Sequence, residues 1–204
     1  MTRTLETLFV TKTYRSDLTA GEAFITDLEE ACRQIAQQDK AGQAWSREKG
    51  YRGYTSYASL DDLTRRDSLF DALKRKLDKH AAAFAKDLHL DLGRRRLKLD
   101  SLWINILKPG GMHSGHIHPH SVLSGTVYVS VPDGAGALRL EDPRLSRMMA
   151  APTRLDEAPR ELQTFIALAP EAGTILMWES WLRHEVLPNG AKTDRISLSF
   201  NYGW

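Results

Sequence analysis

The sequence has little of what marks secreted, membrane or nucleic-acid-binding proteins. Its 204 residues include one cysteine, Cys32, which excludes an intramolecular disulfide and suits a reducing compartment. No apolar run approaches the roughly 18 residues of a membrane span, and the N-terminus has no signal-peptide core. Lys and Arg number 28 against 26 Asp and Glu, so a net charge of +2 gives no clear nucleic-acid signal. We therefore expect a cytoplasmic protein that does not contact a membrane.

The composition is that of a globular protein, with 42% hydrophobic and 26% charged residues. A chain of this length has room for one sizeable hydrophobic core. We expect a single domain over residues 1–204, with helical support over about 1–92 and a β-barrel core over about 97–204. A small-molecule or peptide substrate and a homodimeric assembly both stay open.

The first half of the chain is typical of amphipathic helices. Thr19 and Glu22 form a capping-box pattern, and apolar residues at helical spacing then predict a helix over about 20–38. A second apolar stripe begins at Ser68, where Ser68 and Asp71 form another capping pattern, and it predicts a helix that packs one face on a sheet. The aromatic-rich segment 40–57 has no sustained period, so we expect a long connection there.

After Gly93 the pattern changes to alternation with β-branched and aromatic residues, which predicts strands. Helices followed by short strands indicate an α+β protein in which helices buttress a jelly-roll or cupin-like barrel. Residues 142–162 are expected to form a long surface loop. The predicted strands are LKLDSLWINIL, VLSGTVYVSV, GALRL, TFIALA, GTILMW and RISLSFNY.

Four of the seven histidines, His113, His116, His118 and His120, lie within eight residues. On an extended segment side chains alternate, so the last three should face the same way and at least two imidazoles can converge on one ion. A third ligand must then come from elsewhere in the fold, and His184, at the end of a strong strand, is the expected source. The histidine pattern therefore predicts a metal site made by His116, His118 and His184.

Such a set leaves open positions on one face of the ion, as in non-haem iron oxygenases and unlike a closed structural zinc site. The lone cysteine excludes a Cys-rich zinc site. His120 remains an alternative ligand, and Glu141 or Asp142 could supply a carboxylate. Because Pro119 favours a chain that turns away after His118, we expect His118 rather than His120 at the metal.

Motifs in the second half carry a family resemblance. Ten residues separate His184 from Arg195-Ile196-Ser197, which resembles the distal half of the motif of many iron(II) and 2-oxoglutarate-dependent oxygenases. The stretches HIHPHSVLSGTVYV, EDPR, AGTILMWESWLRHEVLPNG and RISLSFN resemble a bacterial family of such oxygenases with the pattern H-x-H-P-x-S-x-L-S-G-x-x-Y. The resemblance covers about residues 100–204, and it implies a double-stranded β-helix.

The resemblance also implies a cosubstrate site. Arg195 would bind the distal carboxylate of 2-oxoglutarate with its planar guanidinium, from a strand that neighbours the His184 strand. Ser197 and Tyr128 would add hydrogen bonds, and Asn105 would line the pocket, as would Asn201 if its amide is not structural. Iron(II), 2-oxoglutarate and O2 would together hydroxylate a C–H bond of an unidentified substrate.

One departure and two rival interpretations accompany this assignment. In the wider superfamily the first ligands form H-x-D or H-x-E, whereas His118 here replaces the carboxylate and leaves the site one negative charge poorer. Gly110 followed by His116 and His118 also fits the opening of a cupin motif, but Val122 and Leu123 stand where that motif expects Glu. The other rival is a non-catalytic module with a structural metal.

Overall fold

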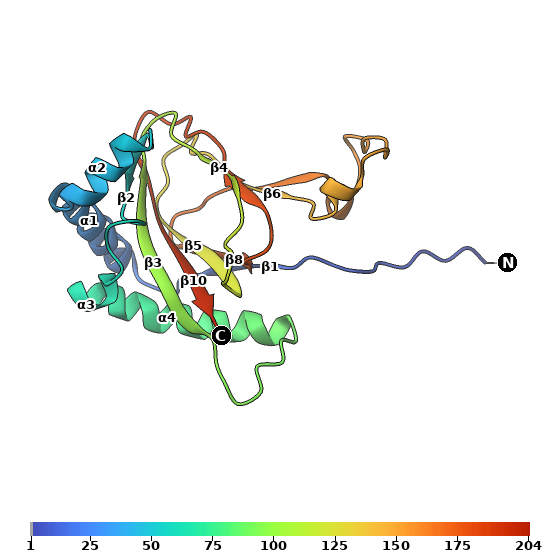
Figure 1. The fold of residues 1–204 in the computed structure, drawn as a ribbon, viewed down its shortest axis with the longest axis horizontal. Helices are drawn as coiled ribbons and strands as arrows, with labels where there is room; N and C mark the ends of the chain where they lie inside the picture. The colour runs from blue at the N-terminus through green and yellow to red at the C-terminus, as the bar shows by residue number, and fades with distance from the viewer. Residues whose placement is uncertain (1) are drawn as a thin grey trace.

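The computed structural model describes residues 2–204, which contain helices and strands in the order shown in Figure 1. The helices are α1 (Glu22–Gln38), α2 (Lys40–Glu48), α3 (Leu63–Arg66) and α4 (Ser68–Asp87). The strands are β1 (Thr13–Asp17), β2 (Gly53–Thr55), β3 (Lys98–Leu107), β4 (His113–His116), β5 (Leu123–Ser130), β6 (Leu138–Glu141), β7 (Phe165–Leu168), β8 (Thr174–Glu179), β9 (His184–Val186) and β10 (Arg195–Gly203).

The two predicted helices are present, but neither begins with the expected cap. Thr19 and Glu22 form no capping box, because Thr19 has a φ of 48° and lies outside the helix, so that Gly21 is the N-cap of α1. At α4 the side chain of Asp67 accepts a hydrogen bond from the backbone N–H of Leu69 at 2.8 Å. The apolar stripe of α4 is buried as expected, with Phe70, Leu73, Leu77, Ala81 and Phe84.

The expectation of an irregular connection over 40–57 is wrong, because α2 and β2 lie within it. Helix α2 has only nine residues, too few to establish a helical period in the sequence. Its start is fixed by Asp39, whose side chain accepts from the backbone N–H of Gly42 at 2.9 Å. The segment therefore forms a short helix followed by an edge strand.

Two antiparallel sheets form the β region. One has six strands in the order β1-β8-β5-β10-β3-β2, and the other has four in the order β4-β9-β6-β7. β1 and β2 form both edges of the larger sheet, and they come from the first half of the chain, outside the range 97–204 expected for the barrel core. Both are short, and each pairs with a longer strand that supplies its hydrogen-bond register.

The larger sheet lies between the helices and the smaller sheet, so two cores share its strands. Side chains of α1 and α4 pack on one face, together with Ile104, Val127 and Leu198. The other face joins the smaller sheet through a second cluster that includes Tyr128 and Leu140. In Figure 1 α1 and α2 lie on one side of the sheet and α4 runs beneath it. Fully burying such aliphatic side chains contributes about 1.5–3 kcal/mol each.

Alternation along β10 decides which residues reach the space between the sheets. Ile196, Leu198 and Phe200 belong to the core under the helices. Side chains of a strand alternate between its faces, so Arg195 and Ser197 point toward the smaller sheet. The polar face of β10 is thus directed into the barrel. Burial of these polar groups costs free energy unless they form hydrogen bonds.

The long surface loop expected over residues 142–162 is confirmed. It contains only the short 3-10 turns η1 (Leu145–Arg147) and η2 (Arg160–Leu162), and Met149 within it is 93% exposed. Figure 1 shows this loop, in orange, extending from the β6 side of the molecule. Among residues 2–204, every helix is too short or too polar to cross a membrane.

Candidate active site

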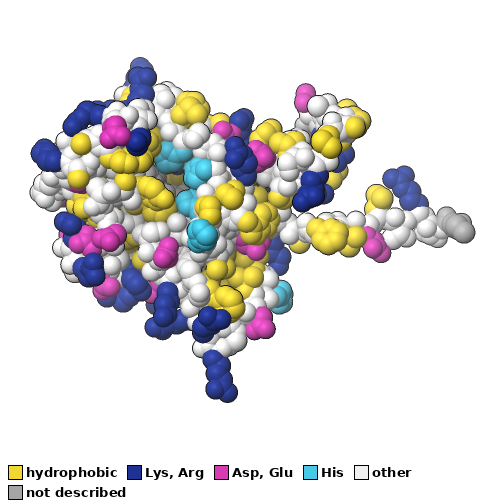
Figure 2. Space-filling model, in the orientation of Figure 1, with side chains coloured by type: hydrophobic (Ala, Val, Ile, Leu, Met, Phe, Trp, Pro, Cys, Tyr) yellow, Lys and Arg dark blue, Asp and Glu magenta, His cyan; other side chains and the backbone are white. Residues whose placement is uncertain are grey.

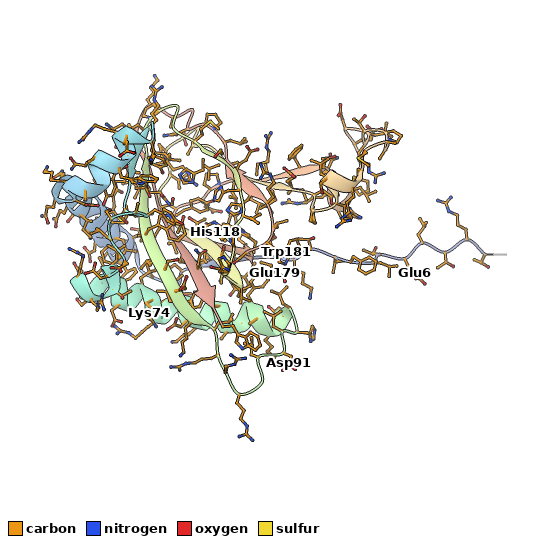
Figure 3. The ribbon with its side chains drawn as sticks, in the orientation of Figure 1. Glu6, Lys74, Asp91, His118, Glu179 and Trp181 are labelled. Carbon is orange, nitrogen blue, oxygen red and sulfur yellow. The ribbon has the colours of Figure 1, made fainter. Side chains whose placement is uncertain are left out.

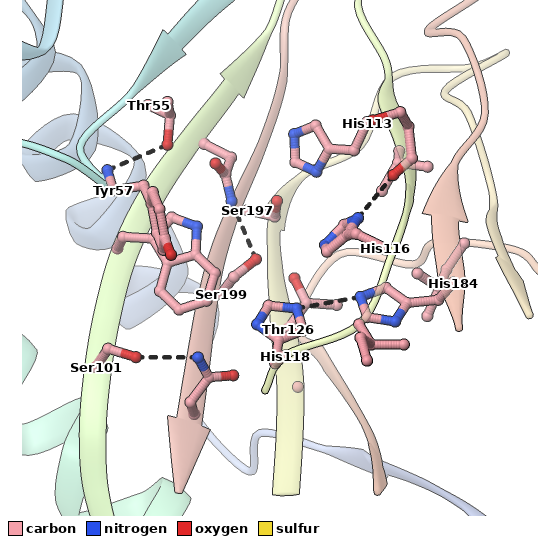
Figure 4. Close-up of a pocket in the computed structure, with 18 of the residues that line it drawn as sticks. Thr55, Tyr57, Ser101, His113, His116, His118, Thr126, His184, Ser197 and Ser199 are labelled. Atoms are coloured by element: carbon pink, nitrogen blue, oxygen red, sulfur yellow. Dashed lines mark hydrogen bonds between the residues drawn. The ribbon is translucent and has the colours of Figure 1, made fainter. Parts of the chain in front are cut away.

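Three imidazoles meet between the two sheets. Pairing of β4 with β9 places His116 opposite His184, and His118 follows two residues after His116. The backbone N–H of His118 donates to the carbonyl of Ser180 at 3.0 Å, which fixes the chain at that point. The ligand-type nitrogens of the three histidines lie within 4.8 Å of one another (Figure 4). The structure therefore brings together the three side chains that the sequence singled out.

The spacing of the nitrogens suits one metal ion. Nε2 of His118 lies 3.2 Å from Nε2 of His184, and the two rings are nearly parallel, with 2° between their planes. Two nitrogens that each lie about 2.1 Å from an ion, at roughly right angles to each other, are about 3 Å apart. Without an ion, two neutral imidazoles can share at most one proton across such a gap.

Backbone carbonyls set the tautomers of two of these imidazoles. Nδ1 of His184 lies 2.8 Å from the carbonyl oxygen of Leu182, and Nδ1 of His116 lies 2.7 Å from that of Ser114. A carbonyl only accepts, so both Nδ1 atoms carry the proton and donate it. The lone pair of a neutral imidazole is then on Nε2, the atom that faces the cluster, as in histidines prepared for metal binding.

Burial also keeps two of the three imidazoles, those of His118 and His184, neutral. Desolvation lowers the pKa of His184 to about 3 and that of His118 to about 4, and the neighbouring His116 lowers both further. Indole rings supply much of this apolar shell. Trp178 meets His184 edge to face at 4.6 Å between ring centres, and Trp103 lies 5.8 Å from His118. Neutral imidazoles with free lone pairs are the form that binds a metal.

The alternative ligands lie outside this cluster. His120 is exposed and has a φ of 72°, so the chain turns after His118 and the expectation that 116, 118 and 120 all face one side is wrong for His120. Asp142 forms an ion pair with Arg144 at 2.8 Å. Glu141 pairs with Arg183 at 3.2 Å. In the described part of the chain, the three-imidazole group has no carboxylate member.

Arg195 is a buried cation without a carboxylate partner among residues 2–204. Its side chain is 1% exposed, and its Nη1 donates to Ser197 Oγ at 3.3 Å. Its guanidinium carbon lies 4.9 Å from the ring centre of Tyr128. Arg195 Nε and the Tyr128 hydroxyl are both buried with no hydrogen-bond partner in the described chain, as is Trp178 Nε1. Buried donors of this kind need an acceptor, and the charge favours an anion.

The strand that carries Arg195 does not neighbour the His184 strand, contrary to expectation. β10 pairs with β3 and β5 in the larger sheet, whereas β9 pairs with β4 and β6 in the smaller one. Arg195 therefore faces the histidine cluster across the barrel instead of along one sheet. Burial raises the pKa of Tyr128, so its hydroxyl stays protonated and can donate.

The two asparagines of the strands have different surroundings. Asn105 Nδ2 donates to Ser199 Oγ at 3.0 Å, which leaves its carbonyl oxygen directed toward the Tyr51 hydroxyl. Asn201 accepts from Ser124 at 2.8 Å and donates to Ser101 at 3.1 Å. Asn201 thus has partners for both ends of its amide, while both asparagines line the same cavity as the histidines.

Sequence reasoning gave no role to His113 and Tyr51, yet both line this cavity. The Tyr51 hydroxyl lies 2.6 Å from His113 Nε2. His113 is three residues before His116, a spacing that puts two side chains on opposite faces of a regular strand. A register irregularity between them in the β4–β9 pairing lets both reach the cavity. No sequence signal marks such a bulge, although Gly115 lies within it.

One open cavity of about 890 Å³ contains all of these groups. Figure 2 shows histidine side chains gathered around a hollow on one face of the molecule. In Figure 3 His118 lies between the two sheets. Lys74 lies on α4, and Asp91 lies below α4 in this view. Tyr57 and Trp103 meet edge to face at 5.3 Å and line the same cavity. The cavity can hold a metal, an anion and part of a further molecule.

The barrel region of the chain matches a known protein family. Residues 101–201 match the sequence model of a family described as "Putative 2OG-Fe(II) oxygenase". The match spans the region whose motifs resemble such oxygenases. It therefore confirms the resemblance. No match to the chain was found among curated proteins.

Solved structures share the fold over most of its length. A prolyl-4-hydroxylase from Pseudomonas putida has a TM-score of 0.64 at 18% identity, with 95% of this chain and 94% of that one covered. The epimerase SnoN, in complex with Fe3+, alpha ketoglutarate and nogalamycin RO, has a TM-score of 0.67 at 13% identity, with 95% and 79% covered. HygX from Streptomyces hygroscopicus, with nickel and 2-oxoglutarate bound, has a TM-score of 0.61 at 13% identity, with 95% of this chain and 82% of that one covered. These likenesses confirm the expected double-stranded β-helix.

Proposed function

Residues 101–201 belong to the 2OG-Fe(II) oxygenases, and on that premise we propose that this protein is an iron(II)- and 2-oxoglutarate-dependent dioxygenase whose metal is held by His116, His118 and His184. Arg195, Tyr128 and Ser197 bind the distal carboxylate of 2-oxoglutarate, and Asn105 lines that pocket. The substrate is a small molecule or a peptide whose C–H bond is hydroxylated.

The observation that carries this proposal is the unpaired, buried Arg195 in the cavity that also contains the three histidines. A generic metal barrel has no need of such a cation, which is costly to bury. 2-Oxoglutarate fits both the three histidines and Arg195. One end can chelate iron, while the other carries the carboxylate that a guanidinium binds with two parallel hydrogen bonds. The unpartnered Arg195 Nε and Tyr128 hydroxyl support this fit.

Bound iron(II) would supply the activation of O2, by which 2-oxoglutarate becomes succinate and CO2 and one oxygen atom enters the substrate. The protein's residues would bind and orient. Carbonyls of Ser114 and Leu182 hold the rings of His116 and His184 with Nε2 toward the metal. Trp178, beside His184, excludes water from that side of the cavity. No side chain is required as a general base.

The hydroxyl groups of Ser197 and Tyr128 can each donate a hydrogen bond. Ser197 Oγ already accepts from Arg195, so its own hydroxyl proton is free for a carboxylate oxygen. Tyr128 stays protonated because burial raises its pKa. Together with the guanidinium they make a set of donors without a competing acceptor. This set favours a dianionic cosubstrate over a 2-oxo acid that lacks the distal carboxylate.

The helices and the barrel act as one unit over residues 1–204 in this proposal, because α1 and α4 pack on the reverse face of the sheet that carries Arg195. A cytoplasmic location is proposed from the reducing environment that iron(II) needs and from the lone, buried thiol of Cys32. A homodimer stays a prediction.

Succinate formation tests the function. Protein loaded with iron(II) and kept reduced with ascorbate should convert 2-oxoglutarate to succinate, even slowly without the substrate. His184→Ala should reduce this to background, whereas His120→Ala, at an exposed position, should not. A non-catalytic metal module would bind iron and form no succinate. A cupin of another reaction class would turn over without any dependence on 2-oxoglutarate.

A further inference from the structure

Tyr51 and His113 form a hydrogen-bonded pair on the wall of the cavity that contains Arg195. Tyr51 comes from the turn between α2 and β2, where its backbone N–H donates to the carbonyl of Ser46 at 2.8 Å. His113 begins β4. Two segments far apart in the sequence thus supply one polar pair, in a cavity that Asn105 and Arg195 also line.

The contacts of the pair indicate which of its atoms carry protons. The Tyr51 hydroxyl has one proton and two acceptors in range, His113 Nε2 at 2.6 Å and Asn105 Oδ1 at 3.4 Å. At 2.6 Å the contact with His113 is shorter than the usual N–H···O hydrogen bond and fits a donating hydroxyl, whereas the 3.4 Å contact with Asn105 is weak. Tyr51 therefore donates to His113 Nε2, and the single ring proton of a neutral His113 must be on Nδ1.

That Nδ1–H group has no hydrogen-bond partner among residues 2–204, although its ring lines the cavity. It joins Arg195 Nε and the Tyr128 hydroxyl, which are also donors without an acceptor. The positive charge of Arg195 is close enough to lower the pKa of His113 further, after desolvation. All three residues line one cavity, and donors without an acceptor around one cavity indicate the place of an anionic ligand.

His113 does not act as a fourth metal ligand. Its Nε2 is occupied by the Tyr51 hydroxyl, and its nitrogens do not belong to the group that lies within 4.8 Å. The bulge in β4 directs it to the cavity beside the cluster, where Arg195 lowers its pKa more than His116 or His118 does. The pair therefore belongs to the anion pocket more than to the metal.

We propose that His113 is a binding residue for the distal carboxylate of 2-oxoglutarate, donating from Nδ1, and that Tyr51 is a positioning residue that fixes its tautomer and ring. This rests on the proposed function, and it deepens it by giving the first half of the chain a part in the cosubstrate site. The carboxylate would then be held from β10 and β5 on one sheet and from β4 on the other.

A comparison of two 2-oxo acids tests this directly. 2-Oxoglutarate and 2-oxobutyrate share the keto-acid end, but only the former has a distal carboxylate. Each is titrated by calorimetry, without oxygen, into iron(II)-loaded wild type, His113→Leu, His113→Gln and Tyr51→Phe. His113→Leu should weaken 2-oxoglutarate by about 10-fold or more, since a hydrogen bond to a charged group is lost. Its 2-oxobutyrate affinity should stay within about two-fold of wild type.

The remaining variants separate binding from structure. His113→Gln keeps an N–H donor and should recover part of the affinity for 2-oxoglutarate. Tyr51→Phe should weaken 2-oxoglutarate less than His113→Leu does, and the double variant should be no weaker than His113→Leu alone, because Tyr51 acts through His113. His120→Ala is the matched control, with both affinities unchanged. If His113→Leu does not fold, Tyr51→Phe and His113→Gln provide the same comparison.

Two results would overturn the proposal. One is an affinity for 2-oxoglutarate in His113→Leu that equals that of wild type. The other is an equal loss for both acids, which would show that His113 only maintains the shape of the cavity. A wild type that binds neither acid would instead contradict the proposed function, so the two failures are distinguishable.

Discussion

The guanidinium carbon of Arg195 lies 4.9 Å from the ring centre of Tyr128, and each of these buried side chains has a polar atom without a hydrogen-bond partner in the described chain. A cation in this position is stabilised only in part by the ring, since a cation–π contact contributes about 2 kcal/mol when desolvated. The arrangement is therefore complete only with an anion bound between these groups.

Loss of Arg195 should be specific for the cosubstrate. Arg195→Ala should weaken 2-oxoglutarate binding by roughly 30-fold or more, since removing one partner of a buried charge pair costs about 2–5 kcal/mol. Arg195→Lys should recover only part, because an ammonium cannot form two parallel hydrogen bonds. Calorimetric titration without oxygen gives the affinities, and elemental analysis should find iron retained in both variants. Equal affinity in Arg195→Ala and wild type would remove this residue from the site.

The second imidazole of the metal site is tested by a matched pair of substitutions. His118→Ala should lose iron, because its Nε2 faces that of His184 at 3.2 Å. His120→Ala should retain iron, because His120 is exposed in a turn with a φ of 72°. Iron content after dialysis against a weak chelator gives the answer. Retention in the first variant and loss in the second would transfer the role to His120.

The metal-free protein should become less stable as the pH falls from about 7 to 4. Burial lowers the pKa of His118 to about 4 and of His184 to about 3, from an ordinary 6.5. Between these values the unfolded chain binds protons that the folded one does not, so the free energy of unfolding decreases with falling pH. Well above pH 6.5 these two groups are neutral in both states and have no effect.

Thermal unfolding at a series of pH values measures this slope. His118→Gln removes one of the titrating groups and should give a shallower slope than wild type. His120→Gln, at an exposed position, should leave the slope as it is in wild type. Equal slopes in wild type and His118→Gln would show that His118 is not desolvated in the folded protein.

Gly53 should tolerate no side chain. Its φ is 151°, and a Cβ would lie 1.9 Å from the carbonyl oxygen of Ile106 on the neighbouring strand. Gly53→Ala should therefore lower the free energy of unfolding by about 2 kcal/mol or more. Gly21→Ala is the control, since nothing lies within 4 Å of its Cβ position, and it should cost about 1 kcal/mol or less. Urea unfolding of both variants gives the comparison.

The metal cluster and the anion pocket were within reach of sequence reasoning. Two histidines on an extended segment, a third at a strand end, and an arginine eleven residues later each have a local chemical reason to occur. Alternation along β10 then places Arg195 and Ser197 on one face, and this follows from the period of a strand alone. Their relative position across two sheets does not follow, because strand order depends on long-range pairing that leaves no local pattern.

The contributions missed by sequence reasoning share one physical cause. β1 and β2 have five and three residues, and both exist because a longer strand offers them a hydrogen-bonding edge. His113 reaches the cavity through a bulge in the pairing of β4 with β9. Tyr51 lies between two elements too short to have a recognisable period. Each depends on tertiary contacts rather than on local propensity.

The central claim is that the histidine cluster and Arg195 together form a site for iron(II) and 2-oxoglutarate, and one absorption titration tests it most directly. Without oxygen, 2-oxoglutarate is added to iron(II)-loaded protein while the visible metal-to-ligand charge-transfer band is followed. A saturable band in wild type, absent from His184→Ala, is the predicted result. A wild type that contains stoichiometric iron and develops no band at millimolar 2-oxoglutarate would contradict the claim.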